Sequence, residues 1–263
     1  MEWVRATRSL NSVSRSQLIS VSARGITTVL ESRPNRLILI ADDPQRSPLI
    51  LPLVLSMRRT EPLILLIVGV VCLALSAVGA AERGTWLLEV FPIFIAVPIL
   101  IATARRFPLT PLSYRLIFVH ALILMVGGHY TYAKVPLGFW MRDAFHLARN
   151  NYDRIGHFAQ GFVPAMLARE ILLRRTPLTR GKSLFFIVTC ICLAISACYE
   201  FIEWGTAVVG GSSADAFLGT QGDVWDTQWD MFTALWGAII AQLLLARVQD
   251  RELLSLAQQE RSA

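Results

Sequence analysis

The sequence predicts an all-α membrane protein, a bundle of six transmembrane helices with both chain ends in the cytoplasm. Three observations lead to this prediction. Of the 263 residues, 54% are hydrophobic and 17% are charged, whereas soluble domains carry about 25% charged residues. The hydrophobic residues come in stretches long enough to cross a bilayer as helices. Arginine and lysine collect on one side of these stretches, so an ordinary soluble domain is excluded.

The first 56 residues differ in kind from the rest of the chain. They are rich in serine and arginine, and their apolar pieces at residues 37–41 and 49–55 are too short to span a membrane. Met57 precedes two arginines and the first long apolar stretch, as a natural start would. We therefore predict that residues 1–56 are a disordered or mis-called N-terminal extension. Residues 57–250 are expected to form the transmembrane domain and residues 251–263 a short cytoplasmic tail.

The first three predicted spans are nearly free of charge. The first, Pro62–Ala81, contains no charged residue, and the second, Trp86–Ala104, contains only Glu89. Two prolines interrupt the second span, but prolines are tolerated in helices that pack against other membrane helices. The third, Leu116–Ala133, carries two histidines and is otherwise mostly apolar. All three have the length that a bilayer requires.

The last three predicted spans carry their polar residues near the ends. The fourth, Ile155–Leu173, has polar groups near both ends, and the fifth, Ser183–Phe201, is apolar up to Glu200. The sixth, Trp229–Ala246, is apolar after Asp230. Between the third and fourth spans, residues 140–150 alternate apolar and polar side chains at helical spacing, which predicts an interfacial helix on the outer leaflet or a lid over a site.

The distribution of positive charge predicts the orientation. With the N-terminal side inside, the cytoplasmic flanks of the spans hold eleven arginines and lysines, and the outer loops hold five. Short cytoplasmic loops are enriched in these residues, which favours an N-in and C-in topology. The net charge of +6 then reflects topology and contact with anionic lipids of the bilayer, and no nucleic-acid partner is expected.

Six ionisable residues fall at the outer ends of the last three spans. Residues three or four apart share a helix face, so each span contributes one pair that can point in one direction. Charged groups in membrane helices normally face a cavity or one another. The six candidate site residues, proposed as a catalytic or binding cluster, are Asp153, His157, Glu200, Glu203, Asp226 and Asp230.

Three chemical interpretations compete for this cluster. Carboxylates and an imidazole suit a divalent metal, for which Asp153, His157 and Glu200 are the candidate ligands. Packed carboxylates beside a histidine also suit acid and base catalysis on a lipid headgroup. The third interpretation is that the acids are solvated helix caps. Capping explains Asp153 but not Glu200 and Glu203, which we expect at a helix C-terminal end that disfavours negative charge.

Three segments carry a resemblance to a known family. They are YDRIGHFAQGF at residues 152–162, YEFIEW at residues 199–204 and FLGTQGDVWDTQWDM at residues 217–231. With them, the chain from about Arg58 to Arg247 resembles the YjdF-like predicted inner-membrane proteins, bacterial domain of unknown function 2238. The resemblance implies a bacterial inner-membrane protein with several spans, but no established activity.

Shorter patterns give a more distant resemblance to the VanZ-like membrane proteins, which are linked to glycopeptide-antibiotic resistance. That family's acid and histidine positions match Asp153, His157, Glu200 and Asp230. This chain departs from the pattern at two positions, with Glu203 in place of a glutamine and alanine 234 in place of an asparagine. The loss of both amides puts a shared ligand in doubt.

These observations lead to three functional hypotheses. The first is that the outward-facing cluster binds or acts on an envelope lipid or a lipid-linked headgroup, with a divalent metal as its cofactor. The second is a transporter coupled to protons or cations, for which intramembrane carboxylates are also expected. The third is a non-catalytic scaffold or assembly factor whose cluster docks a partner. The residues alone leave all three open, and with them the question whether the protein is an enzyme.

Overall fold

The computed structural model divides the chain into two compact units, residues 1–57 and residues 58–263. It describes the backbone of residues 17–23, 26–33, 36–40, 50–211, 215–218 and 220–262. Part of the predicted extension lies outside the described residues, namely residues 1–16, 24–25, 34–35 and 41–49. The last residue of the predicted tail also lies outside them.

The first unit contains a three-stranded antiparallel sheet, which the sequence analysis did not predict. Strands β1 (Gln17–Ala23), β2 (Ile26–Arg33) and β3 (Arg36–Ile40) pair in chain order, with Val21 opposite Thr28 and Leu30 opposite Leu39. These segments contain isoleucine, valine and threonine, which favour strands. The all-α class is confirmed for the second unit, and the disorder of the N-terminal extension stays a prediction. That the segment is a mis-called extension stays a prediction.

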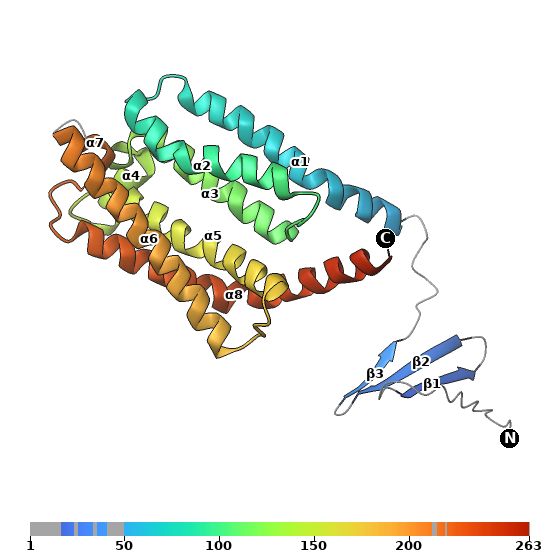
Figure 1. Cartoon of the computed structure of the whole chain (residues 1–263). Helices are drawn as coiled ribbons and strands as arrows, with labels where there is room; N and C mark the ends of the chain where they lie inside the picture. Colours follow the sequence, from blue (N-terminus) through green and yellow to red (C-terminus); the bar gives the residue numbers. More distant parts are fainter. Residues whose placement is uncertain are drawn as a thin grey trace. The chain divides into compact units, whose positions relative to one another are not determined.

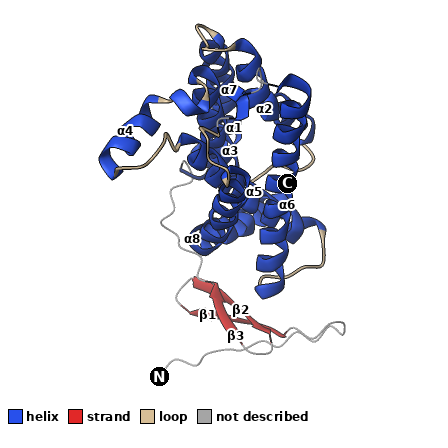
Figure 2. Cartoon of the chain, turned by 90° about the vertical axis from the view of Figure 1, so that its left-hand side faces the viewer, coloured by secondary structure: helices blue, strands red, loops and turns tan. Residues whose placement is uncertain are grey.

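The second unit is a bundle of helices (Figures 1 and 2). Helix α1 begins at Ile50, before the boundary between the units, and the other helices follow in the second unit. The elements are α1 (Ile50–Ala77), α2 (Arg83–Thr103), α3 (Pro111–Tyr130), the short 3-10 helix η1 (Tyr132–Lys134), α4 (Pro136–Phe145), α5 (Tyr152–Arg175), α6 (Lys182–Gly210), α7 (Asp215–Leu218) and α8 (Asp226–Ser262).

Each predicted span coincides with a long helix. Among the described residues, five helices are long and apolar enough to cross a membrane, namely α1 from Thr60 onward, α2, α3, α6 and α8. Helix α5, which contains the fourth predicted span, has 24 residues but carries charged residues near both ends. It packs against α3, α6 and α8, so neighbouring helices cover its polar groups. The count of six spans and the N-in, C-in orientation stay predictions.

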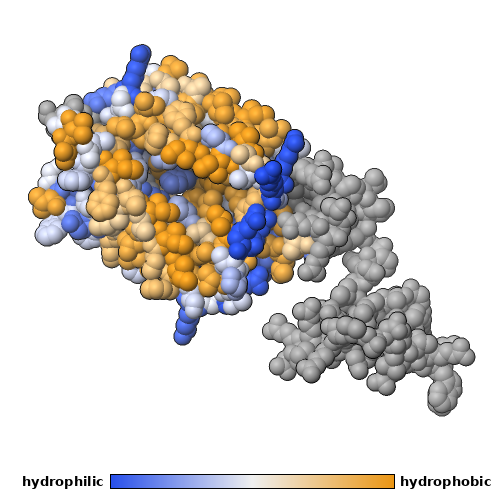
Figure 3. Space-filling model, in the orientation of Figure 1, coloured by the Kyte–Doolittle hydropathy of each residue, from blue (hydrophilic) through white to orange (hydrophobic). Residues whose placement is uncertain are grey.

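Apolar side chains cover much of the outside of the bundle. Large hydrophobic residues such as Leu63, Phe91 and Phe186 are exposed, and orange side chains cover most of the visible face of the second unit in Figure 3. Exposed apolar surface of this extent marks a membrane or protein contact. The buried core is smaller, with Met166 of α5 packed against residues of α6 and α8 such as Val188 and Ala241. The outer surface is therefore suited to lipid.

Helices α5 and α8 cross at unusually close range through two glycines. A Cβ atom on Gly161 would lie 1.8 Å from the backbone oxygen of Ala234, and one on Gly237 would lie 2.2 Å from the backbone oxygen of Phe158. Small residues allow such close approach between membrane helices. Because His157 lies one turn before Gly161 and Asp230 lies one turn before Ala234, the crossing controls the separation of His157 and Asp230.

Two peripheral segments also bear on the predictions. Helix α4 forms within the segment predicted to be amphipathic and exposes Trp140 and Phe145, as an interfacial helix would. Its position on the outer leaflet stays a prediction. The predicted cytoplasmic tail continues helix α8 without a break up to Ser262. The last span and the tail therefore form one helix.

Candidate functional site

His157 lies at the centre of the candidate site. Its Nε2 atom is 3.5 Å from Oδ1 of Asp153 and 3.7 Å from Oδ1 of Asp230, and its Nδ1 atom is 3.7 Å from Oε1 of Glu200. These four residues come from α5, α6 and α8, so three helices contribute to one cluster. The structure thus brings together the four residues that the VanZ-like patterns share with this chain.

The two ring nitrogens of His157 face different partners. Nδ1 lies 3.1 Å from Oε1 of Gln160, one turn later on the same helix. When Nδ1 donates its hydrogen to Gln160, the lone pair of Nε2 points to the side of Asp153 and Asp230. A histidine whose second nitrogen is held by a hydrogen bond is oriented for metal binding.

The cluster is buried, and part of it lacks hydrogen bonds. Asp230 is 1% exposed, His157 4% and Glu200 5%. Within the part of the chain that the structure describes, Oδ2 of Asp230 and both carboxylate oxygens of Glu200 have no hydrogen-bond partner of ordinary geometry. Burying a carboxylate without compensation costs several kcal/mol, so these oxygens are suited to accept a cation.

Two arginines that were not among the predicted site residues pair with the acids. Arg154 contacts Asp223 at 3.2 Å and Asp226 at 2.9 Å, and it also donates a hydrogen bond to Oδ1 of Asp230. Arg149 contacts Asp226 at 2.5 Å. Asp226 therefore serves mainly as an ion-pair partner of the two arginines. Asp230 accepts from Arg154 through Oδ1, and its Oδ2 atom is not used in this contact. The sequence signal for Arg154 was its position beside Asp153, in the segment that resembles the VanZ-like pattern.

A further acid joins the site from α2. Glu89 is buried, and the hydroxyl of Tyr199 donates a hydrogen bond to its Oε2 at 3.4 Å. The Tyr199 ring in turn packs edge-on against His157, with 6.0 Å between ring centroids. The sequence offered one signal for Glu89, because an acid in an otherwise uncharged span normally has a specific role.

Glu200 and Glu203 occupy a different position from the one expected. Helix α6 continues to Gly210, so both acids lie two to three turns before its end. The expectation that they sit at a helix C-terminal end is wrong, because the two acids interrupt the apolar run without ending the helix. Both side chains are buried and share one helix face. Burial inside the bundle also argues against solvated caps.

The first turn of α5 is positioned by hydrogen bonds from outside the helix. The side chain of Asn150 donates to the backbone oxygen of Val135 at 2.9 Å and accepts from the backbone N–H of Tyr152 at 3.0 Å. Gln221 bonds both backbone groups of Asn150. Asn150 thereby ties the segment before α8 to the start of α5, where the site begins.

Carboxyl groups outnumber arginines in this region. Two arginines, Arg149 and Arg154, face a larger number of acids. The acids of the region are Glu89, Asp153, Glu200, Glu203, Asp223, Asp226 and Asp230. The region therefore offers more carboxyl groups than its two arginines pair with, and carboxyl oxygens are ligands for divalent metals.

Three residues lie close enough together to hold a metal ion, and this candidate metal trio differs in one member from the predicted ligands. Among the described residues, one ligand atom each from Asp153, His157 and Asp230 lies within 4.8 Å of the other two. Glu200, the third predicted ligand, lies on the Nδ1 side of the imidazole. Two ligands at about 2.1 Å from a tetrahedral metal are about 3.4 Å apart. The spacings of 3.5 and 3.7 Å around Nε2 match this separation.

Comparisons with known proteins agree with the architecture. Residues 61–251 match the family described as "Predicted membrane protein (DUF2238)". The chain is 54% identical over 199 residues to "Inner membrane protein YjdF" of Escherichia coli (strain K12). The aligned region covers 74% of this chain and 95% of that protein. No solved structure matches the chain. The predicted YjdF-like resemblance and the multi-pass inner-membrane location are confirmed, whereas the VanZ-like resemblance stays a prediction. The chain belongs to the DUF2238 family of membrane proteins.

Proposed function

We propose that this membrane protein binds a divalent metal ion through Asp153, His157 and Asp230. The bound ion then holds the anionic headgroup of an envelope lipid or lipid-linked molecule at the outer leaflet. One observation carries the proposal. A buried imidazole nitrogen faces carboxylates of two different helices at 3.5 and 3.7 Å.

These distances favour a shared cation over direct hydrogen bonds. Hydrogen bonds between nitrogen and oxygen are 2.7–3.2 Å long, and both spacings exceed this range. The unpartnered Oδ2 of Asp230 is available to the same ion. Mixed oxygen and nitrogen ligands suit Mn²⁺, Fe²⁺ or Zn²⁺. Gln160, whose Oε1 atom lies 3.1 Å from Nδ1, would orient the imidazole from the other side.

The surface next to the site supports a lipid ligand. Trp225 and Trp229 flank the start of α8 and are 63% and 50% exposed. Together with Gln228 and Phe232 they line a shallow hollow of about 500 Å³. Trp225 directly precedes Asp226, and Trp229 directly precedes Asp230. An aromatic hollow beside an ion site suits the apolar part of a lipid whose headgroup reaches the ion.

The first test is the metal content of detergent-purified protein and its melting temperature with added Mn²⁺, Zn²⁺ or Mg²⁺. We expect about one metal per chain in the native protein and a melting temperature that rises with metal. The Asp230→Asn variant should lose both, because one ligand charge is removed. The Asp143→Asn variant is the matched control, since Asp143 is exposed on α4. Native protein without metal, whose melting is unaffected by any of the three ions, would overturn the proposal.

A lipid-binding measurement then tests the second half of the proposal. Native protein and Asp230→Asn are compared for retention of lipid phosphate after extraction from bacterial envelopes, with metal present and with a chelator. We expect the retained phosphate to depend on metal and to be lower in the variant. Equal retention in all samples would confine the function to metal binding.

Cation-coupled transport is a second candidate, because the acids are buried. Glu89 lies within α2, and the side chains of the cluster are buried between the helices. Proteoliposomes loaded with a metal-sensitive dye test this function. Uptake that is lost in Asp230→Asn but not in Asp143→Asn would favour transport. The scaffold hypothesis would be favoured if changing Glu200 and Glu203 to alanine disturbed a protein complex without altering metal content.

A further inference from the structure

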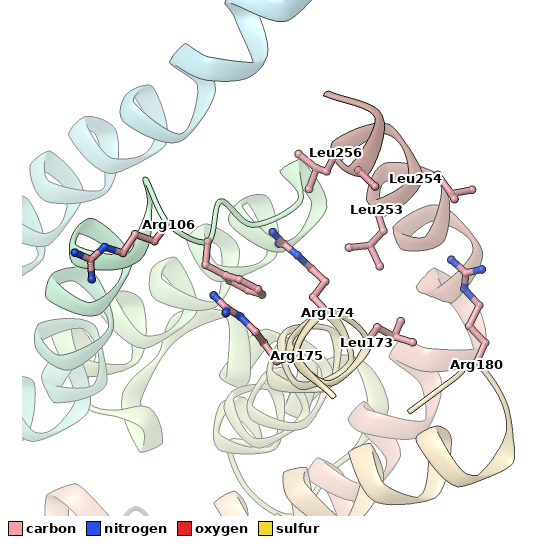
Figure 4. Close-up of a pocket in the computed structure, with 10 residues that line it drawn as sticks. Arg106, Leu173, Arg174, Arg175, Arg180, Leu253, Leu254 and Leu256 are labelled. Carbon is pink, nitrogen blue, oxygen red and sulfur yellow. The ribbon is translucent and has the colours of Figure 1, made fainter. Parts of the chain in front are cut away.

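A second polar feature lies at the other end of the helix bundle, where α5 ends. A cavity of about 460 Å³ is lined by the end of α5, the segment after α2 and the last turns of α8. Figure 4 shows arginines of the first two segments on one side of it and leucines of α8 on the other. The charged lining residues are Arg106, Arg174, Arg175 and Arg180.

The positive charge of this cavity is only partly neutralised. Arg174 pairs with Glu170 at 2.9 Å, and Arg180 pairs with Asp250 at 3.0 Å. Asp250 is shared with Arg169 at 2.8 Å. Among the described residues, Arg106 and Arg175 form no ion pair with a carboxylate. Two guanidinium groups therefore remain for an anionic ligand.

Phe107 holds two of these arginines in place. The guanidinium of Arg174 stacks over the Phe107 ring at 3.8 Å, and that of Arg175 lies over the same ring at 4.7 Å. Arg174 also donates a hydrogen bond to the backbone oxygen of Pro108 at 2.6 Å. Cation–π contacts hold guanidinium groups without consuming their hydrogen-bond donors. Arg175 is thus held while its donors stay available for phosphate oxygens.

The opposite wall of the cavity is apolar. Leu253, Leu254 and Leu256 of α8 line it, and Leu254 is 57% exposed. A small soluble anion would gain nothing from this wall, whereas an acyl chain would bury it. The sequence also predicts that this end of the bundle faces the cytoplasm, where basic pockets between membrane helices bind anionic lipid headgroups.

We propose that an anionic phospholipid of the cytoplasmic leaflet occupies this cavity. Its phosphate lies between Arg106 and Arg175, and an acyl chain lies along Leu253 and Leu254. The site is at the opposite end of α5 from His157 and uses none of its residues. It therefore stands independently of the proposed metal function.

Binding of short-chain phosphatidylglycerol to detergent-purified full-length protein tests the proposal, with short-chain phosphatidylcholine as the neutral comparison. We expect the native protein to prefer phosphatidylglycerol. The double variant Arg106→Gln/Arg175→Gln should bind it about 30-fold more weakly, since a basic residue near an anionic lipid contributes about a factor of five. The double variant Arg247→Gln/Arg251→Gln removes the same charge at the same end from exposed positions outside the cavity, and it should bind normally.

The possible outcomes separate the alternatives. Equal weakening in both double variants would show general charge attraction and overturn the proposal. Glycerol phosphate that binds as tightly as phosphatidylglycerol would show that the cavity takes a soluble phosphate ester, which also overturns it. A Leu253→Gln variant that weakens phosphatidylglycerol binding but not glycerol phosphate binding would support the placement of the acyl chain.

Discussion

The close crossing of α5 and α8 leads to the sharpest prediction, the effect of replacing Gly161 by alanine. Its new Cβ atom would lie 1.8 Å from the backbone oxygen and 2.6 Å from the backbone carbon of Ala234. Both contacts are with backbone, which cannot rotate away as a side chain does. The two helices would therefore have to separate by at least about 1 Å. Overpacking of this kind costs about 1–3 kcal/mol.

The same displacement would act on the metal trio. Gly161 lies four residues after His157, and Ala234 lies four residues after Asp230, so both pairs share a helix face. The 3.7 Å spacing of Nε2 and Oδ1 would widen beyond the separation of two ligands on one metal. We expect Gly161→Ala to lower both the stability and the metal content, although it removes no ligand.

Thermal unfolding in detergent measures the first effect. A loss of 1–3 kcal/mol corresponds to a melting temperature lower by roughly 2–12 °C. Gly205→Ala is the matched control, because it also lies inside a helix and its Cβ would meet nothing within 4 Å. The control should melt at the native temperature or slightly above it. A Gly161→Ala protein that melts and binds metal like the control would refute the reasoning.

Two further predictions concern polar side chains that position the ends of α5. Asn150→Ala should lower the free energy of unfolding by about 1–3 kcal/mol, because buried backbone groups lose their partners, whereas Asn151→Ala should have little effect because that side chain forms no capping hydrogen bond. Glu170→Ala should cost about 3–5 kcal/mol, since the buried carboxylate binds Arg174 and accepts hydrogen bonds from Thr110 and Ser113. Glu61→Ala, which removes a more exposed ion pair, should cost at most about 1 kcal/mol. Chemical denaturation in micelles would check both, and equal stability of either variant and its control would contradict the prediction.

The extent of the membrane helices was largely predictable, but their ends were not. Hydropathy is a local property, so the apolar runs placed the helices correctly. Helix α6 continues past its two acids through a further, largely apolar stretch to Gly210. Helix α8 continues beyond its apolar run into polar sequence as far as Ser262. The strands of residues 17–40 were missed because their short alternating pattern is weak beside the signal of a membrane span.

The candidate site was predictable as a set of residues but not as a set of contacts. Spacing along the helices identified Asp153, His157, Glu200 and Asp230. It did not show that Arg154 would pair with Asp226, because these residues are 72 positions apart in the chain. Glu89, on another helix, was noticed only as a lone charge. Ion pairs across helices depend on packing that no local pattern records.

The sequence by itself determined that this is a multi-pass membrane protein with acids and a histidine near one end of its helices. Apolar stretches and charge bias are local, and the bilayer acts on them directly. Only the tertiary structure decided which acid faces which nitrogen of His157. That choice depends on the close approach of α5 and α8 at Gly161 and Gly237, because the separation of two helices is set by the smallest residues between them.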